Sequence, residues 1–86
     1  MSIVGRTEDG RLVFCGAKVF LMKDVHGIDV AMTREYLSDQ GYVIDAIGFI
    51  NAAKKAGWKP STILRELEYG LNIPQEVLSC RAHLLQ

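Results

Sequence analysis

The first 22 residues consist of short apolar runs separated by residues that form turns. The runs are Ile3-Val4, residues 11–15 and residues 18–22. Asp9-Gly10 between the first two is a strong signal for a β-hairpin, and Gly16-Ala17 between the second and third fits a two-residue turn whose first position is glycine. The pattern therefore predicts a three-stranded antiparallel meander in which residues 11–15 and 18–22 are neighbouring strands.

The second and third expected strands are apolar at successive positions, without the alternation of a strand that has one wet face. Strands of this kind are usually buried on both faces. The helices that follow can cover one face, so the other face would remain as an apolar patch that soluble monomers rarely tolerate. We therefore expect a homodimer through that face or through the sheet edge.

After a connector over residues 23–32, the apolar positions recur at helical spacing. Thr33 is a candidate N-cap for the first helix, and Gly41 is its candidate C′ residue. Asp45 is a candidate N-cap for the second helix, and Pro60 fits the first position of the third. We expect four short helices: residues 33–40, 45–57, 60–70 and 74–86. The whole chain is then a single α+β domain spanning residues 1–86.

The second and third expected helices form a helix-turn-helix-like hairpin. Ala53 is small enough for two helices to approach, Gly57 permits a left-handed turn, and Ile63 anchors the following helix. We expect Ile50, Ala53, Ile63 and Leu67 to be buried together, with Trp58 packed against them. An ordinary packed helical hairpin, in which Gly57 only ends a helix, is the alternative interpretation of this pattern.

The same hairpin carries the candidate contacts with nucleic acid or with a partner. Polar side chains at the start of the second helix can reach phosphates or bases, and the surrounding cations can contact phosphates. The candidates are Lys54, Lys55, Lys59, Ser61, Thr62 and Arg65. Leu64, Glu66 and Glu68 count against DNA binding, because apolar or acidic side chains there would face or approach a polyanion.

The net charge of the chain excludes one class of nucleic-acid-binding protein, and the distribution of charge along the chain is uneven. The ten basic and ten acidic residues of the 86-residue chain give a net charge of zero, which excludes a strongly basic nucleic-acid coat protein. Between residues 24 and 45 there are five acids and one base, whereas residues 54–65 contain four bases and no acid. Apolar residues make up 49% of the chain, which favours a partner that covers some of them.

The sequence contains no pattern typical of catalysis. His26 and His83 lie near no recognisable nucleophile, the eight glycines form no phosphate-binding loop, and no ligands have metal-site spacing. We expect no enzyme activity, no cofactor and no small-molecule substrate. Cys15 and Cys80 are expected to be free thiols, although a disulfide between them remains an alternative. Without a signal-peptide or membrane-span pattern, we expect a cytoplasmic protein that does not bind membranes.

These observations predict a small, non-catalytic cytosolic interaction or regulatory protein that acts through protein–protein contacts. Its partner would be another protein or a second copy of the chain. The alternative is a helix-turn-helix transcriptional regulator that binds duplex DNA through the residues named above.

Overall fold

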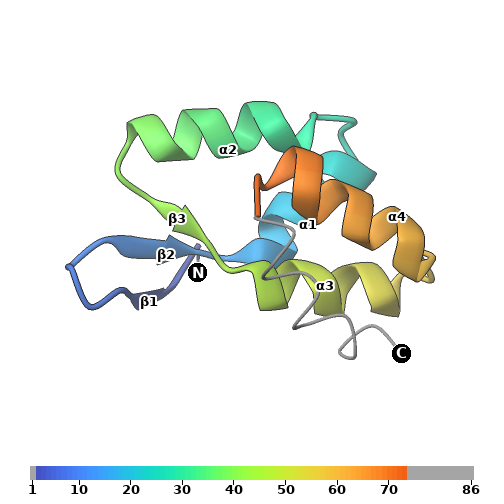
Figure 1. The fold of residues 1–86 in the computed structure, drawn as a ribbon, viewed down its shortest axis with the longest axis horizontal. Coiled ribbons are helices and arrows are strands. Elements are labelled where there is room, and N and C mark those ends of the chain that lie inside the picture. Colours follow the sequence, from blue (N-terminus) through green and yellow to red (C-terminus); the bar gives the residue numbers. More distant parts are fainter. Residues whose placement is uncertain (1, 74–86) are drawn as a thin grey trace.

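The computed structural model describes residues 2–73, which contain three short strands and four α-helices (Figure 1). The elements are β1 (Ile3–Arg6), β2 (Leu12–Phe14), α1 (Gly16–Asp24), α2 (Val30–Asp39), β3 (Val43–Ile44), α3 (Ala46–Lys55), α4 (Pro60–Arg65) and a π-helical turn η1 (Glu66–Gly70). This composition confirms the α+β class. The fourth expected helix, residues 74–86, lies outside the described residues.

The hairpin expected around Asp9-Gly10 is confirmed. β1 and β2 pair in antiparallel fashion, and Gly10 has φ +91° in the connecting turn. The Thr7 hydroxyl donates to the Asp9 carboxylate, and Arg11 Nε donates to it at 3.1 Å. These two bonds, the Thr7 bond first, hold the pKa of Asp9 below its ordinary value because they stabilise the charged carboxylate.

The prediction of the third strand, and of its antiparallel pairing, is wrong. β2 has β1 on one side and β3 on the other, and the β2–β3 pair is parallel, with Val13 opposite Val43 and Phe14 opposite Ile44. The sheet is therefore mixed, not an antiparallel meander. Two helices, α1 and α2, connect β2 to β3, as a parallel pair requires a long crossover.

Residues 16–24, which include the segment expected to be that strand, form helix α1 instead. A short apolar run does not distinguish a buried strand from a buried helix segment. The helix is favoured because it turns Val19 and Phe20 into the core, where the Phe20 ring meets Phe49 of α3 edge-on with 5.8 Å between ring centroids. The two-sided apolar sheet face expected to form a dimer is therefore absent.

α1 and α3 approach closely because Gly16 has no side chain. A Cβ atom at position 16 would lie 1.8 Å from the Asp45 carbonyl oxygen and 2.5 Å from the Phe49 backbone nitrogen. Both atoms belong to the backbone at the start of α3, so they cannot rotate away. Gly16 thus fixes how near the two helices pack, a role different from the hairpin turn expected for it.

The helix boundaries agree with the expected signals at several positions. Gly41 and Gly57 have φ of +86° and +88°, which suits the residue after a helix end, and Pro60 is the first residue of α4. Asp45 precedes α3 as expected but makes no capping hydrogen bond with its side chain. α2 begins at Val30, so Thr33 lies inside the helix, where its hydroxyl donates to the Asp29 carbonyl at 3.3 Å.

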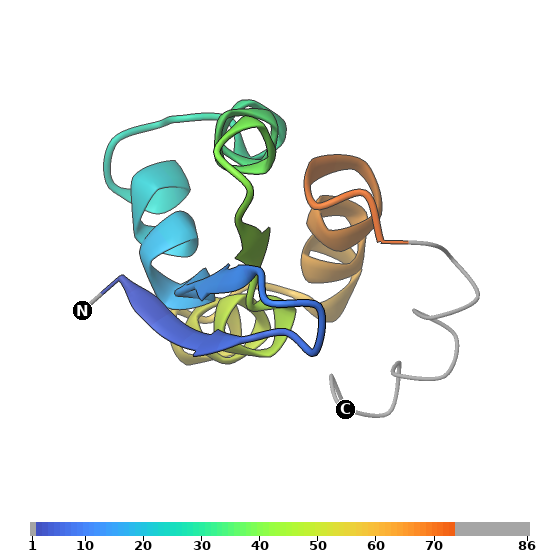
Figure 2. The same ribbon diagram turned by 90° about the vertical axis from the view of Figure 1, so that its left-hand side faces the viewer.

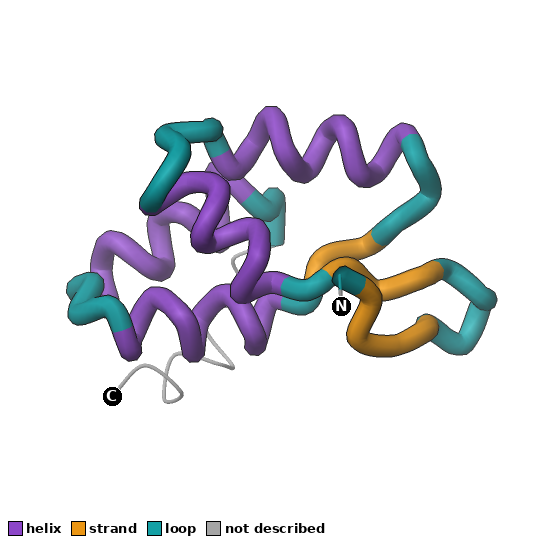
Figure 3. The backbone as a smooth tube through the Cα atoms, turned by 180° about the vertical axis from the view of Figure 1, so that it is seen from behind, coloured by secondary structure: helices purple, strands orange, loops and turns teal. Residues whose placement is uncertain are grey.

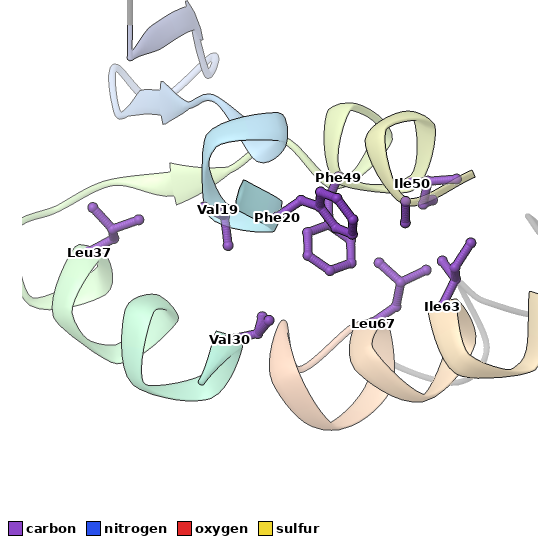
Figure 4. Close-up of a cluster of buried hydrophobic side chains, with 9 residues drawn as sticks. Val19, Phe20, Val30, Leu37, Phe49, Ile50, Ile63 and Leu67 are labelled. Carbon is purple, nitrogen blue, oxygen red and sulfur yellow. The ribbon is translucent and has the colours of Figure 1, made fainter. Parts of the chain in front are cut away.

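The four helices surround one core (Figures 2 and 4). Its buried residues are Val19, Phe20, Val30, Leu37, Phe49, Ile50, Ala53, Ile63 and Leu67. The expected burial of Ile50, Ala53, Ile63 and Leu67 is confirmed. Trp58 packs against this core, and its ring meets that of Phe20 edge-on with 4.9 Å between ring centroids. From behind, the strands lie at one end of the molecule and the turn between α3 and α4 at the other (Figure 3).

Candidate interaction surfaces

An apolar stripe runs along the outer face of α2 and the loop before it. Ile28, Met32 and Tyr36 are spaced four residues apart, and 38%, 65% and 66% of their surfaces are exposed. Met32 and Tyr36 share one side of α2 at this spacing, and Ile28 lies in the loop before it. Large apolar side chains standing in a row are therefore left in contact with solvent.

The stripe borders a cavity of about 310 Å³ between β2, α1 and α2. Its lining is Phe14, Met22, Ile28, Met32, Thr33, Tyr36 and Leu37. Thr33 and Tyr36 are the two members of this lining with a hydroxyl, and that of Thr33 is already bonded to the Asp29 carbonyl. We call this cavity and the bordering stripe the α1–α2 groove. Its lining has no charged side chain, so it is suited to holding apolar side chains.

Two methionines give the groove an adaptable wall. Met22 contributes to the lining from α1, Met32 from α2 and Phe14 from β2. Methionine is unbranched and polarizable, and it is common on surfaces that accept partners of varied shape. The sequence interpretation missed this groove because it placed residues 18–22 in a strand. The spacing of Ile28, Met32 and Tyr36 was the available signal.

The six polar residues proposed from the sequence all lie at the surface. Lys54 and Lys55 are in the last turn of α3, Lys59 is the N-cap of α4, and Ser61, Thr62 and Arg65 are in α4. The structure therefore brings them together around the turn at residues 56–59, at the end of the molecule away from the hairpin (Figure 1). Ser61 and Arg65 are one helical turn apart, on the side of α4 opposite the buried Ile63.

The two acids that follow α4, Glu66 and Glu68, are both less exposed than the six polar residues. Glu66 Oε2 is buried and makes no hydrogen bond within residues 2–73, and it lies toward Gly70. Glu68 is half-buried. The described part of the chain shows no ion pair between Arg65 and Glu68. The expected conflict between Glu66 and a polyanion is therefore weaker than the sequence suggests.

Neither surface has the groups of a metal or redox site. Within residues 2–73, no three His, Cys, Asp or Glu side chains come together as metal ligands. Cys15 is a free, half-buried thiol, whereas Cys80 lies outside the described residues. None of the helices over that same span is long and apolar enough to cross a membrane.

Comparisons with protein-family models, with curated proteins and with solved structures found no match to this chain.

Proposed function

We propose that this protein is a small, non-catalytic interaction or regulatory protein that binds another protein through the α1–α2 groove. One observation carries the proposal: Ile28, Met32 and Tyr36 stand exposed in a row beside an apolar cavity. Exposed apolar patches of this kind mark interaction surfaces, and grooves between helices commonly receive a partner's helix. A cytoplasmic location is part of the proposal, and the free thiol of Cys15 fits a reducing compartment.

A second copy of the chain is one candidate partner. The homodimer expected from the sequence would use a two-sided apolar sheet face or the sheet edge, and the helical conformation of residues 16–24 removes the first of these. A dimer would use the groove or an outer edge of the sheet, since β1 and β3 are its edge strands within residues 2–73. Light scattering across micromolar concentrations tests this directly, with a monomer mass of 9.6 kDa as the reference.

DNA binding through α3 and α4 is the second candidate function. It is favoured by the cluster of six exposed polar residues at one corner and by the inward position of Glu66. Ala53 and Ile63 are fully buried on either side of the turn, and Gly57 has a left-handed backbone, which is common in the turn of a helix-turn-helix. The zero net charge supplies little of the phosphate attraction that such proteins need.

Recovery of the tagged protein from its native cells distinguishes the two functions. A partner protein bound in the groove should be lost with Met32→Ser and retained with Tyr69→Ser. Tyr69 is a matched control because it is 72% exposed but lies on η1, outside the groove. Both substitutions are at exposed positions, and circular dichroism would verify that both variants fold.

The DNA arm of the same experiment uses Lys54→Glu combined with Lys55→Glu. If protein binding is the function, this double variant keeps the partner. If DNA binding is the function, the wild type should bind duplex DNA with a steep dependence on salt, and the double variant should lose both the binding and the steep slope. Salt-steep DNA binding that is indifferent to Met32→Ser would contradict the protein-binding proposal.

A further inference from the structure

The charged side chains that α2 places beside the α1–α2 groove are all acidic. At 100° per residue, Asp29, Glu35 and Asp39 lie within about 60° of Met32 around the helix, and all three are exposed. Arg34, the one base on α2, lies about 160° from Met32 on the other side. The apolar stripe is therefore flanked by carboxylates alone on this helix.

Arg34 pairs with one carboxylate of this border, Glu35, whereas Asp29 and Asp39 make no ion pair within residues 2–73. Arg34 is held on the far side of α2, where its Nε donates to the Gly70 carbonyl at 3.0 Å, and its Nη2 is 3.7 Å from Glu35. On α1, Lys18 lies one turn before Met22, and its Nζ donates to the Ser2 hydroxyl at 3.0 Å. His26, in the loop between α1 and α2, is exposed. The border of the stripe thus favours a partner that brings positive charge.

The strand beneath the groove cannot accept a further strand. Phe14 belongs to β2, and both edges of β2 are already paired, one with β1 and the other with β3. Addition of an extended peptide requires a free edge. The groove instead runs beside α2, a helix of ten residues and so about 15 Å long, which matches about three turns of a second helix.

We infer that the α1–α2 groove binds an amphipathic helix of a partner protein that carries lysine or arginine beside its apolar anchors. This inference rests on the proposed function and adds the chemistry of the partner. Apolar side chains of that helix enter the cavity between Met22, Phe14 and Met32, while its cations approach Asp29, Glu35 and Asp39. The groove supplies the affinity, and the carboxylates select the charge of the partner.

A second copy of this chain fits the groove poorly. Pairing of two α2 helices about a two-fold axis would place Asp29, Glu35 and Asp39 of both copies in one interface, where like charges repel. The chain's own basic corner lacks the other requirement, because the outer face of α4 presents Ser61 and Arg65 rather than apolar anchors. Both arguments favour a different protein as the partner.

The test uses two synthetic helices of about 14 residues with the same leucine positions. One carries lysine at every polar position and the other carries glutamate. The reporters are the ¹³C-labelled methyl groups of Met22 and Met32, which line the groove from α1 and α2. We expect the lysine peptide to shift both methyl signals saturably and to bind at least about tenfold more tightly than the glutamate peptide. This preference should diminish in 0.5 M salt, roughly as screening predicts.

Variants connect the preference to the residues. Glu35→Gln with Asp39→Asn should reduce the advantage of the lysine peptide several-fold, whereas Glu8→Gln, at an exposed acid in the hairpin turn, should leave it unchanged. Tyr36→Ser should weaken both peptides, and Tyr69→Ser neither. All of these positions are exposed, so the variants should keep the wild-type melting temperature.

Each outcome of the titration decides one point. Equal binding of the two peptides in the groove would overturn the inferred charge of the partner and leave the protein-binding proposal intact. If neither peptide shifts Met22 and Met32, the helical occupant is overturned, and recovery of the protein from cells decides separately whether the groove binds a partner. Shifts that depend on protein concentration without any peptide would identify a second copy as the occupant and overturn the inference.

Discussion

Substitution of Gly16 by alanine should be among the most destabilising small changes in this protein. The added methyl would lie 1.8 Å from the Asp45 carbonyl oxygen, so α1 and α3 must separate by about 1.6 Å to reach an ordinary contact of 3.4 Å. Because the clash is with backbone, we expect a loss at or above the upper end of overpacking effects, about 3 kcal/mol or more. That is a large share of the roughly 5–15 kcal/mol that stabilises a typical domain.

Thermal unfolding followed by circular dichroism measures this loss. A decrease of 3 kcal/mol corresponds to a melting temperature lower by roughly 12–24 °C for a domain of this size. Gly5→Ala is the matched control, since a Cβ there meets nothing within 4 Å. Gly48→Ala is intermediate, because its Cβ meets the movable Asp45 carboxylate. If Gly16→Ala melts within about 2 °C of Gly5→Ala, the close packing of α1 on α3 is wrong.

Three further substitutions test the rest of the fold. Leu67→Ala should cost about 2–5 kcal/mol in urea unfolding, because the side chain is buried in the core, and a neutral result would contradict that position. Gly57→Ala should cost roughly 1–2 kcal/mol through its left-handed backbone alone, since no atom lies within 4 Å of the new methyl. Asp9→Asn should lower the melting temperature slightly at pH 7 and not at about pH 2: the depressed pKa of Asp9 stabilises the fold above its unfolded pKa, and this stabilisation is lost as pH falls through the folded pKa. A shift that is the same at both pH values would exclude the carboxylate as its cause.

The parts of the fold that could be predicted are those specified by neighbouring residues. Asp9-Gly10 indicated the hairpin, and Gly57 and Pro60 indicated the end of one helix and the start of the next. The burial of Ile63 and Leu67 followed from helical spacing. In each case the chemistry of a turn or of a repeating apolar position was sufficient, without knowledge of distant contacts.

The parts that could not be predicted depend on contacts between distant segments. Residues 18–22 are apolar in a way that suits a strand as well as a helix, and the packing of Phe20 on Phe49 and Trp58 favours the helix. β3 has only two residues, and its pairing with β2 is visible only once α1 and α2 form the crossover. The groove needs the same helix, since Met22 reaches it from α1.

Of the two candidate surfaces, the sequence indicated the exposed polar residues around the turn at residues 56–59 but not the α1–α2 groove. The exposure and clustering of Lys54, Lys55, Lys59, Ser61, Thr62 and Arg65 agree with the sequence interpretation, although their role stays a prediction. The acid excess between residues 24 and 45 was visible in the sequence, but its position beside an apolar stripe was not. That position depends on the start of α2 at Val30, three residues before the expected N-cap.

The most direct test of the central claim is photo-crosslinking inside the native cell from a benzoylphenylalanine at position 32. The same probe at position 69, which is similarly exposed but outside the groove, is the control. A probe at position 61 samples the basic corner around the turn at residues 56–59. The α1–α2 groove as the binding surface predicts a discrete protein adduct from position 32, absent from position 69 and removed by Tyr36→Ser. Adducts only from position 61, and to DNA, would contradict it.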